Sequence, residues 1–153
     1  MRRVRGNLRS EIRNLKLDSG EPRVHRDVVM ATDTRKGDEI QERLIKFGAR
    51  VSRVAKKLPL TMEGHYIAQQ ILRSGLAAAP NYAEARAAES RADFIHKLRI
   101  VLKELNETHS WLRQIVANGL FSRDKMELII AENQELRWIL AASLKTARRT
   151  SPI

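Results

Sequence analysis

Residues 69–111 read QQILRSGLAAAPNYAEARAAESRADFIHKLRIVLKELNETHSW, and this stretch decides the fold. Its apolar residues recur at intervals of three and four, the spacing of one face of an α-helix. Because a polar group near a helical core costs stability unless it finds a partner, a plain bundle does not need polar residues within that repeat. We therefore interpret the stretch as a signature of folding and assembly, in which polar residues fix the alignment of two helices. The polar residues at helix-compatible intervals are Gln69, Arg73, Ser74, Asn81, Glu84, Ser90, Asp93, Lys97, Glu104 and Glu107.

The second half of the stretch begins the most regular helix of the chain. Ser90 and Asp93 have the spacing of a capping box, with Asp in place of the usual Glu. Asn118–Gly119 is a signal for the end of a helix. The pattern therefore predicts one helix between these two signals. Its apolar seam consists of Phe94, Leu98, Val101, Leu105, Thr108, Leu112 and Ile115.

The first half of the stretch predicts a slim helix that a neighbouring helix can approach closely. Thr61 is its expected N-cap. Gly75 and the alanines at 77–79 leave its middle without large side chains. Pro80 is expected to kink this helix or to split it in two.

Two further helices complete the pattern. The first is expected from Asp38 and ends at Leu58–Pro59, because proline disfavours helix at the residue before it. The last helix follows Ser122 as its cap. Four helices joined by short turns predict an all-α fold, an antiparallel up-down-up-down four-helix bundle with its second helix kinked near Pro80. The apolar seam of the first helix consists of Ile40, Leu44, Phe47, Val51, Val54 and Leu58. The seam of the last helix consists of Met126, Ile129, Asn133, Leu136, Leu140 and Ala147.

Composition narrows the class of protein. The chain has 153 residues, enough for one domain with a real core. It has no cysteine, which excludes disulfides, thiolate zinc sites and a cysteine nucleophile. No apolar run approaches the roughly twenty residues that span a bilayer, and no signal peptide is recognisable. We therefore expect a soluble, cytoplasmic protein without a membrane partner.

The first 37 residues differ from the rest. They are rich in arginine and glycine and poor in large apolar side chains. Leu8, Ile12 and Leu15 form at most one short amphipathic helix, which nothing anchors. Two interpretations stay open: a mobile basic arm that touches nucleic acid, or a poorly constrained extension, with Met30 as an alternative translation start. We favour the second, and predict a basic, flexible N-terminal extension at 1–37 and a four-helix bundle domain at 38–150.

The run RSG-x5-NYAEA-x3-ES-x2-DFIHKL-x4-KEL-x-ET-x2-WL resembles the family of four-helix bundle proteins that are also called 23S ribosomal RNA intervening-sequence proteins. The resemblance covers roughly Ile40 to Arg148. It implies an antiparallel bundle that assembles as a homopentamer, with no established molecular role. The present sequence departs from the family pattern at Leu76 and Ala77, where the family often has Thr-Ser.

The family is also similar in fold to the accessory protein of diversity-generating retroelements. That protein is a basic pentameric barrel that binds a reverse transcriptase and nucleic acid. The present sequence is closer to the intervening-sequence branch. The resemblance therefore implies a reverse transcriptase as a partner only weakly.

Catalytic and metal chemistry is not expected. Asp93 and His96 have the i, i+3 spacing of a carboxylate–histidine metal pair, but bundle metal sites need two such pairs and further carboxylates. His96 falls on the presumed outer face, and His65 and His109 are isolated. No phosphate loop, nucleophile elbow or zinc-protease motif is present. We predict no enzyme activity, no metal and no cofactor.

Four polar residues invite a structural interpretation. Asn81 and Glu84 are one turn apart, and Glu104 lies in the middle of the third helix. Together with Arg73 they are expected to form a hydrogen-bonded network that pins helix two to helix three. A functional groove is the alternative. The structural interpretation predicts that Glu84→Ala lowers the melting temperature or disturbs assembly.

The positive charge also follows a pattern. The net charge is +11, which favours a polyanionic partner such as RNA or DNA. Lys46, Arg50, Arg53 and Lys57 form one stripe on the first helix, with steps of four, three and four. A solvated face is the plain alternative for each residue. Further candidates for phosphate contacts are Arg86, Arg91, Arg148 and Arg149.

Two classes of function remain. The first is a non-catalytic homo-oligomer that binds the RNA or DNA backbone, as a ribonucleoprotein component or an accessory of an rRNA intervening sequence. The second is a protein-interaction scaffold, such as a reverse-transcriptase accessory subunit, with incidental positive charge. Repetition of the stripe around a pentamer would strengthen its field. Few aromatic residues accompany the stripe, so we expect strongly salt-dependent backbone contacts and no base stacking.

Overall fold

The computed structural model describes residues 23–149, with side chains from residue 33 onward. Four helices make up this part of the chain: α2 (Arg23–Lys56), α3 (Met62–Arg86), α4 (Arg91–Ala117) and α5 (Arg123–Arg149). Over these described residues there is no strand, which confirms the all-α four-helix bundle. The chain divides into two units at Lys36/Gly37, and the bundle is the second of them.

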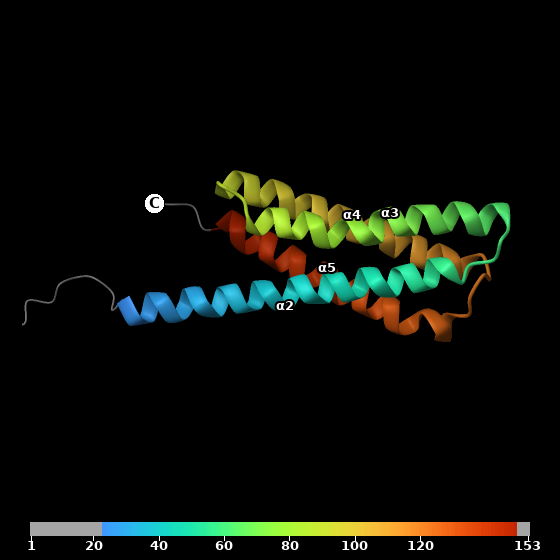
Figure 1. Ribbon diagram of the computed structural model, residues 1–153, viewed down its shortest axis with the longest axis horizontal. Coiled ribbons are helices and arrows are strands. Elements are labelled where there is room, and N and C mark those ends of the chain that lie inside the picture. Colours follow the sequence, from blue (N-terminus) through green and yellow to red (C-terminus); the bar gives the residue numbers. More distant parts are fainter. Residues whose placement is uncertain (1–22, 150–153) are drawn as a thin grey trace, which may run out of the picture. The chain divides into compact units, whose positions relative to one another are not determined.

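The helices of the bundle run alongside one another (Figure 1). Their buried side chains form one apolar core. α4 packs against both α3 and α5. α2 completes the ring, because Gln41 bonds to the Ala79 carbonyl on α3 and Arg43 bonds to Glu132 on α5. The seams expected from the three–four spacing supply the core. Its largest fully buried side chains are Phe47, Leu44, Ile71, Leu98, Leu105, Leu112, Ile115, Met126, Leu136, Leu140, Val51 and Val101.

α2 begins earlier than the sequence predicted. Helix starts at Arg23 rather than at Asp38. Pro22 directly precedes its first residue, and no proline or glycine then occurs before Gly37. Gly37 costs an isolated helix only about 1 kcal/mol relative to alanine, so helix continues through it. The helix expected around Leu8 lies outside the described residues, and the flexibility of the extension stays a prediction.

The ends of α3 and α4 follow the expected signals. The Thr61 hydroxyl accepts a 3.0 Å hydrogen bond from the Gly64 N–H and caps α3. Ser90 accepts a 3.1 Å bond from the Asp93 N–H and caps α4 in the same way. α4 ends at Ala117, and Gly119 then takes a φ of +68°, where a side chain would be strained.

The slim middle of α3 receives α2. A Cβ added at Gly75 would lie 2.6 Å from Cγ1 of Val51, so only glycine allows this approach. α3 runs through Pro80 as one helix, so of the two expected alternatives, a kink or a split, the split does not occur. The side-chain amide of Asn81 donates to the Ala77 carbonyl at 2.8 Å, and that of Gln41 donates to the Ala79 carbonyl at 3.0 Å. Both bonds add a side-chain donor to a carbonyl just before Pro80, which itself has no N–H to donate to the Leu76 carbonyl one turn earlier.

A polar layer crosses the core. The hydroxyl of Thr108 on α4 lies 2.9 Å from that of Ser74 on α3, and both are buried. On the other side of α4, the Asn133 amide of α5 donates to the Leu105 carbonyl at 3.1 Å. Each polar group therefore finds a partner on a neighbouring helix, which fixes the register of the bundle. Among the described helices, none is long and apolar enough to span a membrane.

Candidate nucleic-acid interface

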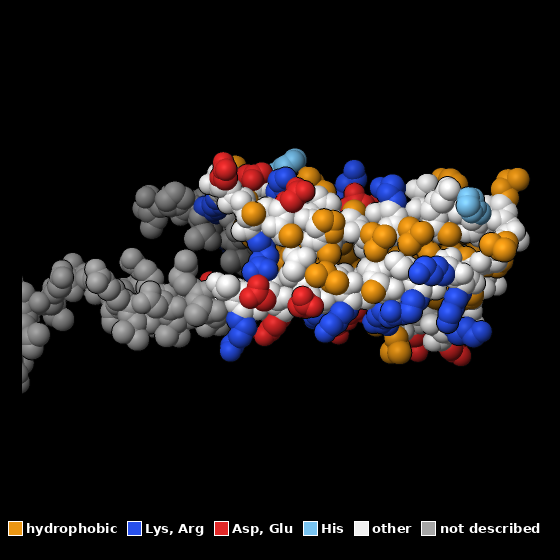
Figure 2. Space-filling view, viewed as in Figure 1, with side chains coloured by type: hydrophobic (Ala, Val, Ile, Leu, Met, Phe, Trp, Pro, Cys, Tyr) orange, Lys and Arg blue, Asp and Glu red, His pale blue; other side chains and the backbone are white. Residues whose placement is uncertain are grey.

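Positive and apolar side chains occupy separate areas of one face of the bundle. Figure 2 shows Lys and Arg side chains gathered along the C-terminal half of α2. A band of hydrophobic side chains lies next to them, along the border between α2 and α3. Ile45 and Leu76, which belong to these two helices, are each 48% exposed. The two areas offer chemically different contact surfaces.

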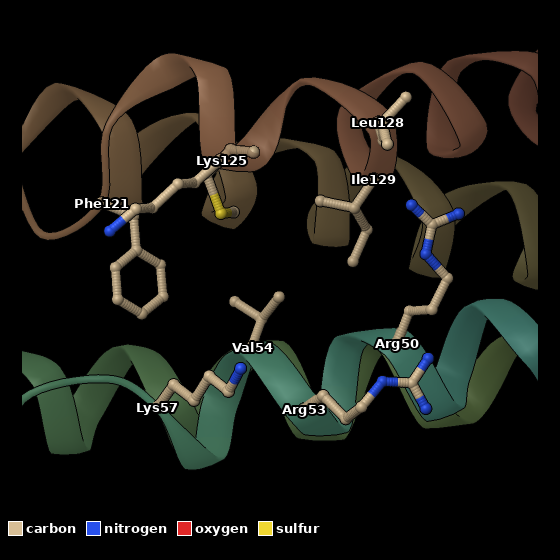
Figure 3. A pocket seen from close by; sticks show the side chains of 9 residues that line it. Arg50, Arg53, Val54, Lys57, Phe121, Lys125, Leu128 and Ile129 are labelled. Atoms are coloured by element: carbon tan, nitrogen blue, oxygen red, sulfur yellow. The ribbon is translucent and has the colours of Figure 1, made fainter.

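A groove lies between α2 and α5 on the basic side (Figure 3). We call it the basic groove; its volume is about 490 Å³. α2 contributes cations to one wall, and α5 contributes a cation and apolar residues to the other. The residues that line it are Arg50, Arg53, Val54, Lys57, Phe121, Lys125, Met126, Leu128 and Ile129.

The helical spacing of α2 produces this wall. Leu44, Phe47 and Val51 face the core and are fully buried. A residue two or three positions after a buried residue of this helix lies at the edge of the buried face. Arg50, Arg53 and Lys57 occupy such positions and therefore lie beside the groove. Lys46 belongs to the same stripe and is exposed, but it does not line the groove. The structure therefore brings together three of the four residues of the predicted stripe.

The cations of the basic groove carry no compensating acid. Between residues 46 and 57 the sequence has five Lys or Arg residues and neither Asp nor Glu. Within the part of the chain that the structure describes, Arg50, Arg53, Lys57 and Lys125 form no ion pair. Like charges one turn apart on a helix, such as Arg53 and Lys57, destabilise it slightly. A local excess of positive charge therefore faces the groove.

Arg43, two turns earlier on α2, shows the contrast. Its Nη2 lies 2.9 Å from Oε2 of Glu132 and 2.7 Å from Oε2 of Glu135. The hydrogen bond with Glu132, followed by that with Glu135, raises the pKa of the Arg43 guanidinium above its ordinary value. This charge is neutralised within the bundle and links α2 to α5. It is a structural contact, whereas the cations of the groove remain available to a ligand.

The other four predicted phosphate contacts lie at the opposite end of the bundle. Arg86 forms a 2.6 Å ion pair with Asp38. Arg91 donates from Nε to the Ala147 carbonyl at 2.6 Å, and so satisfies the C-terminal end of α5. Arg148 and Arg149 are exposed in the last turn of α5, where positive charge suits the helix dipole. The eight predicted residues therefore do not form one continuous surface. Two of them, Arg86 and Arg91, bind other groups of the protein.

The four predicted network residues form separate contacts. Arg73 on α3 pairs with Glu104 on α4 at 3.7 Å, as expected for a link between these helices. Glu84 instead pairs with Lys97 at 2.6 Å, and this hydrogen bond raises the pKa of Lys97. Asn81 bonds to the backbone of its own helix. The α3–α4 pair is thus pinned at two places, and the four side chains do not form one connected network.

The three histidines whose side chains the structure describes, His65, His96 and His109, do not form a site with neighbouring acids. His96 is exposed, as predicted, and His65 lies 3.1 Å from the side chain of Gln69. His109 bonds through Nδ1 to the Asn133 Oδ1 at 3.0 Å. Among the residues with described placement, no three His, Asp or Glu side chains come close enough together to hold a metal ion.

Sequence reasoning missed three residues of the basic groove, one of which is Leu128 on α5. Phe121 lies in the turn between α4 and α5, and Lys125 lies in the first turn of α5. Figure 3 shows the Phe121 ring extending from this turn toward Val54 and Lys57 on α2. Few aromatic residues were expected beside the stripe, and Phe121 is the one that lines the basic groove. Only the spacing of Phe121 and Met126 around Ser122, typical of a hydrophobic staple, could have drawn attention to it.

Comparison with known proteins identifies the family. The family described as 23S rRNA-intervening sequence protein matches residues 37–142, which is most of the chain. The chain belongs to this family. The match begins at the division between the two units, so the family's region coincides with the bundle. The resemblance carried by the run between Arg73 and Leu112 is confirmed.

A solved structure supports the same assignment. The chain is similar to a protein of unknown function from the S23 ribosomal protein family of Bacteroides thetaiotaomicron VPI-5482. The two are 34% identical, and the similarity covers 72% of this chain and 98% of that one, with a TM-score of 0.67. No curated protein matches the chain.

Proposed function

We propose that this protein is a non-catalytic module that binds the phosphate backbone of RNA or DNA through the basic groove. The observation that carries the proposal is the group of Arg50, Arg53, Lys57 and Lys125, which line one groove and form no ion pair within the described residues. Arginine binds phosphate through two parallel hydrogen bonds, and lysine adds point charge. The net charge of +11 supports attraction of a polyanion at long range. The family description, which refers to 23S rRNA, agrees with such a ligand.

The test is a salt titration of binding with matched charge variants. The groove variant replaces Arg50, Arg53 and Lys57 with Gln. The control variant replaces Arg99, Lys103 and Lys145, three exposed cations elsewhere, also with Gln. Both lose the same charge, so a difference between them reports position rather than net charge.

We expect the groove variant to bind a labelled RNA oligonucleotide much more weakly than the control variant at low salt. Its plot of log affinity against log salt concentration should be flatter by about 0.7 per lost contact with a single strand, or about 0.9 with a duplex. Equal binding by the two variants contradicts the groove as the site. Absence of binding by the unaltered protein at low salt contradicts the function, and favours the protein-interaction scaffold.

We further propose that the protein acts as a homo-oligomer, with the pentamer that the resemblance implies as the expected form. The support is the band of hydrophobic side chains between α2 and α3, which includes Ile45 and Leu76. Exposed apolar patches of this kind mark protein contacts. A closed ring needs two different surfaces on each subunit. Trp138 on α5, which is 65% exposed, offers a second apolar surface.

Light scattering coupled to size exclusion tests this assembly. Leu76→Glu places a charge in the band and should reduce the particle mass. Met62→Glu is the control, because Met62 is 92% exposed at the start of α3. A monomeric unaltered protein, or an unchanged mass for Leu76→Glu, contradicts assembly through the band.

A further inference from the structure

We infer that the basic groove holds an unpaired base together with its phosphates, so that the ligand is single-stranded rather than duplex nucleic acid; this inference rests on the proposed function. Its basis is the division of the groove into two kinds of surface. Arg50, Arg53, Lys57 and Lys125 are positive. The remaining lining residues are apolar: Val54, Phe121, Met126, Leu128 and Ile129.

Phe121 gives the groove an aromatic surface. The side chain is only partly buried, and Figure 3 shows its ring in the space between α5 and α2. The ring extends toward Val54 and Lys57, and the Lys125 side chain runs close to it. A volume of about 490 Å³ lies within the ~300–1,000 Å³ range of small-molecule sites. The groove is thus large enough for a base as well as for a backbone phosphate.

The apolar part of the groove distinguishes the two forms of nucleic acid. A duplex keeps its bases stacked inside and presents phosphates, which would leave the Phe121 ring in contact with water. An unpaired base can cover this ring and stack on it, while its neighbouring phosphates reach Arg50 and Arg53.

Charge alone predicts the opposite preference. A duplex carries about one negative charge per 1.7 Å of its axis, a higher linear density than that of a single strand. A surface that offered only cations would therefore favour the duplex at low salt. Preference for the single strand consequently identifies contacts with the base.

Phe121 also has a structural role, which the test must separate from binding. It precedes Ser122 and lies at the position that packs against Met126 in a hydrophobic staple, and it contacts the core. Phe121→Leu keeps an apolar side chain at that position but removes the π face. Phe121→Trp keeps the π face and enlarges it. Tyr66→Leu is the control, because Tyr66 is an aromatic residue, 54% exposed, that does not line the groove.

The experiment measures fluorescence anisotropy with one labelled oligonucleotide, used as a single strand and annealed to its complement at the same salt concentration. We expect the single strand to bind more tightly. Phe121→Leu should weaken single-strand binding by about fivefold or more, the range of base–aromatic stacking, and leave duplex binding and the salt dependence unchanged. Phe121→Trp should bind the single strand at least as well as the unaltered protein, and Tyr66→Leu should bind it equally well.

Four results would overturn the inference. Duplex binding as tight as single-strand binding, with normal salt dependence, contradicts it but leaves the proposed function intact. The same holds if Phe121→Leu weakens binding of the single strand and of the duplex equally, or if Phe121→Trp binds the single strand less tightly than the unaltered protein. Absence of binding by either oligonucleotide overturns the inference and the proposed function together, and leaves an acidic protein segment as the occupant to examine.

Discussion

Arg73 Nη1 lies 3.7 Å from Oε2 of Glu104, a buried carboxylate oxygen that accepts no hydrogen bond from any described residue. Arg73 also bonds to Glu107 on the same helix as Glu104. One exposed guanidinium on α3 therefore balances two carboxylates on α4. Glu84, by contrast, pairs with Lys97 near the surface, and its side chain is 58% exposed.

The first prediction compares these two contacts. Arg73→Ala should destabilise the bundle by about 1–2 kcal/mol, toward the lower end of the range for a buried polar group left without a partner, because water can reach a half-exposed site. Glu84→Ala should shift the melting temperature much less, since exposed ion pairs contribute little. The sequence pattern places both residues in one network and predicts that Glu84→Ala lowers the melting temperature or disturbs assembly. Denaturant unfolding of both variants checks the order, and a larger loss for Glu84→Ala would contradict it.

The second prediction concerns the contact between α2 and α3. Gly75→Ala should destabilise the protein by about 1–3 kcal/mol, because the added methyl group would overlap Val51. In a helix without this contact, the same change stabilises by up to about 1 kcal/mol. The test is a double-mutant cycle with Val51→Ala, measured by denaturant unfolding. Gly75→Ala should be nearly neutral or stabilising on the Val51→Ala background, and an equal cost on both backgrounds would contradict the steric explanation.

The seams show how much of the fold the sequence could predict. Leu98, Leu105 and Leu112 are fully buried, because burial along a helix follows its own period. The caps at Thr61 and Ser90 were also predictable, since the donor and acceptor lie within one turn. These features are local, and a local pattern is sufficient to find them.

Contacts between distant segments were harder to predict. The partner of Arg91 is a carbonyl of α5, and no sequence pattern joins it to residue 147. Phe121 lies in a turn, where helical spacing does not predict which way a side chain points or which residues of another helix it meets. Trp138 flanks the apolar seam of α5 but is 65% exposed, and spacing alone does not show where such a flanking residue leaves the core. The basic groove depends on the packing of α2 beside α5, which no local sequence pattern predicts.

The third prediction follows from the contact between Arg91 and the end of α5. Arg91→Ala leaves the Ala147 carbonyl without its side-chain donor and should cost about 1 kcal/mol. Because the loss is local, hydrogen exchange should quicken in the last turn of α5 more than elsewhere. Arg148→Ala, an exposed neighbour, is the control and should leave this exchange unchanged. Nucleic-acid affinity should change no more than in that control, and a selective loss for Arg91→Ala would move the binding surface to this end of the bundle.

The fourth prediction concerns pH and His109. Burial, followed by repulsion from Arg137, lowers the pKa of His109, although its hydrogen bond with Asn133 opposes this. In the unfolded chain the imidazole titrates near its ordinary value of 6.5. The unfolded state therefore binds a proton more readily than the folded state, and stability must fall with falling pH. The contribution is complete above pH 6.5 and is lost as pH falls through the lowered pKa.

His109→Gln should flatten this part of the pH dependence, because an amide can still bond to Asn133 but does not titrate. The charged residues near the ring are Arg113 and Arg137, with Arg123 and Glu127 along the same α4–α5 groove. Because the substitution replaces only the titrating ring, the difference in slope between pH 5 and 7 from the unaltered protein reports the imidazole. His96→Gln, at an exposed position on α4, should leave the slope unaltered. Denaturant unfolding across this range gives the measurement, and an unchanged slope for His109→Gln would show that another group carries the pH dependence.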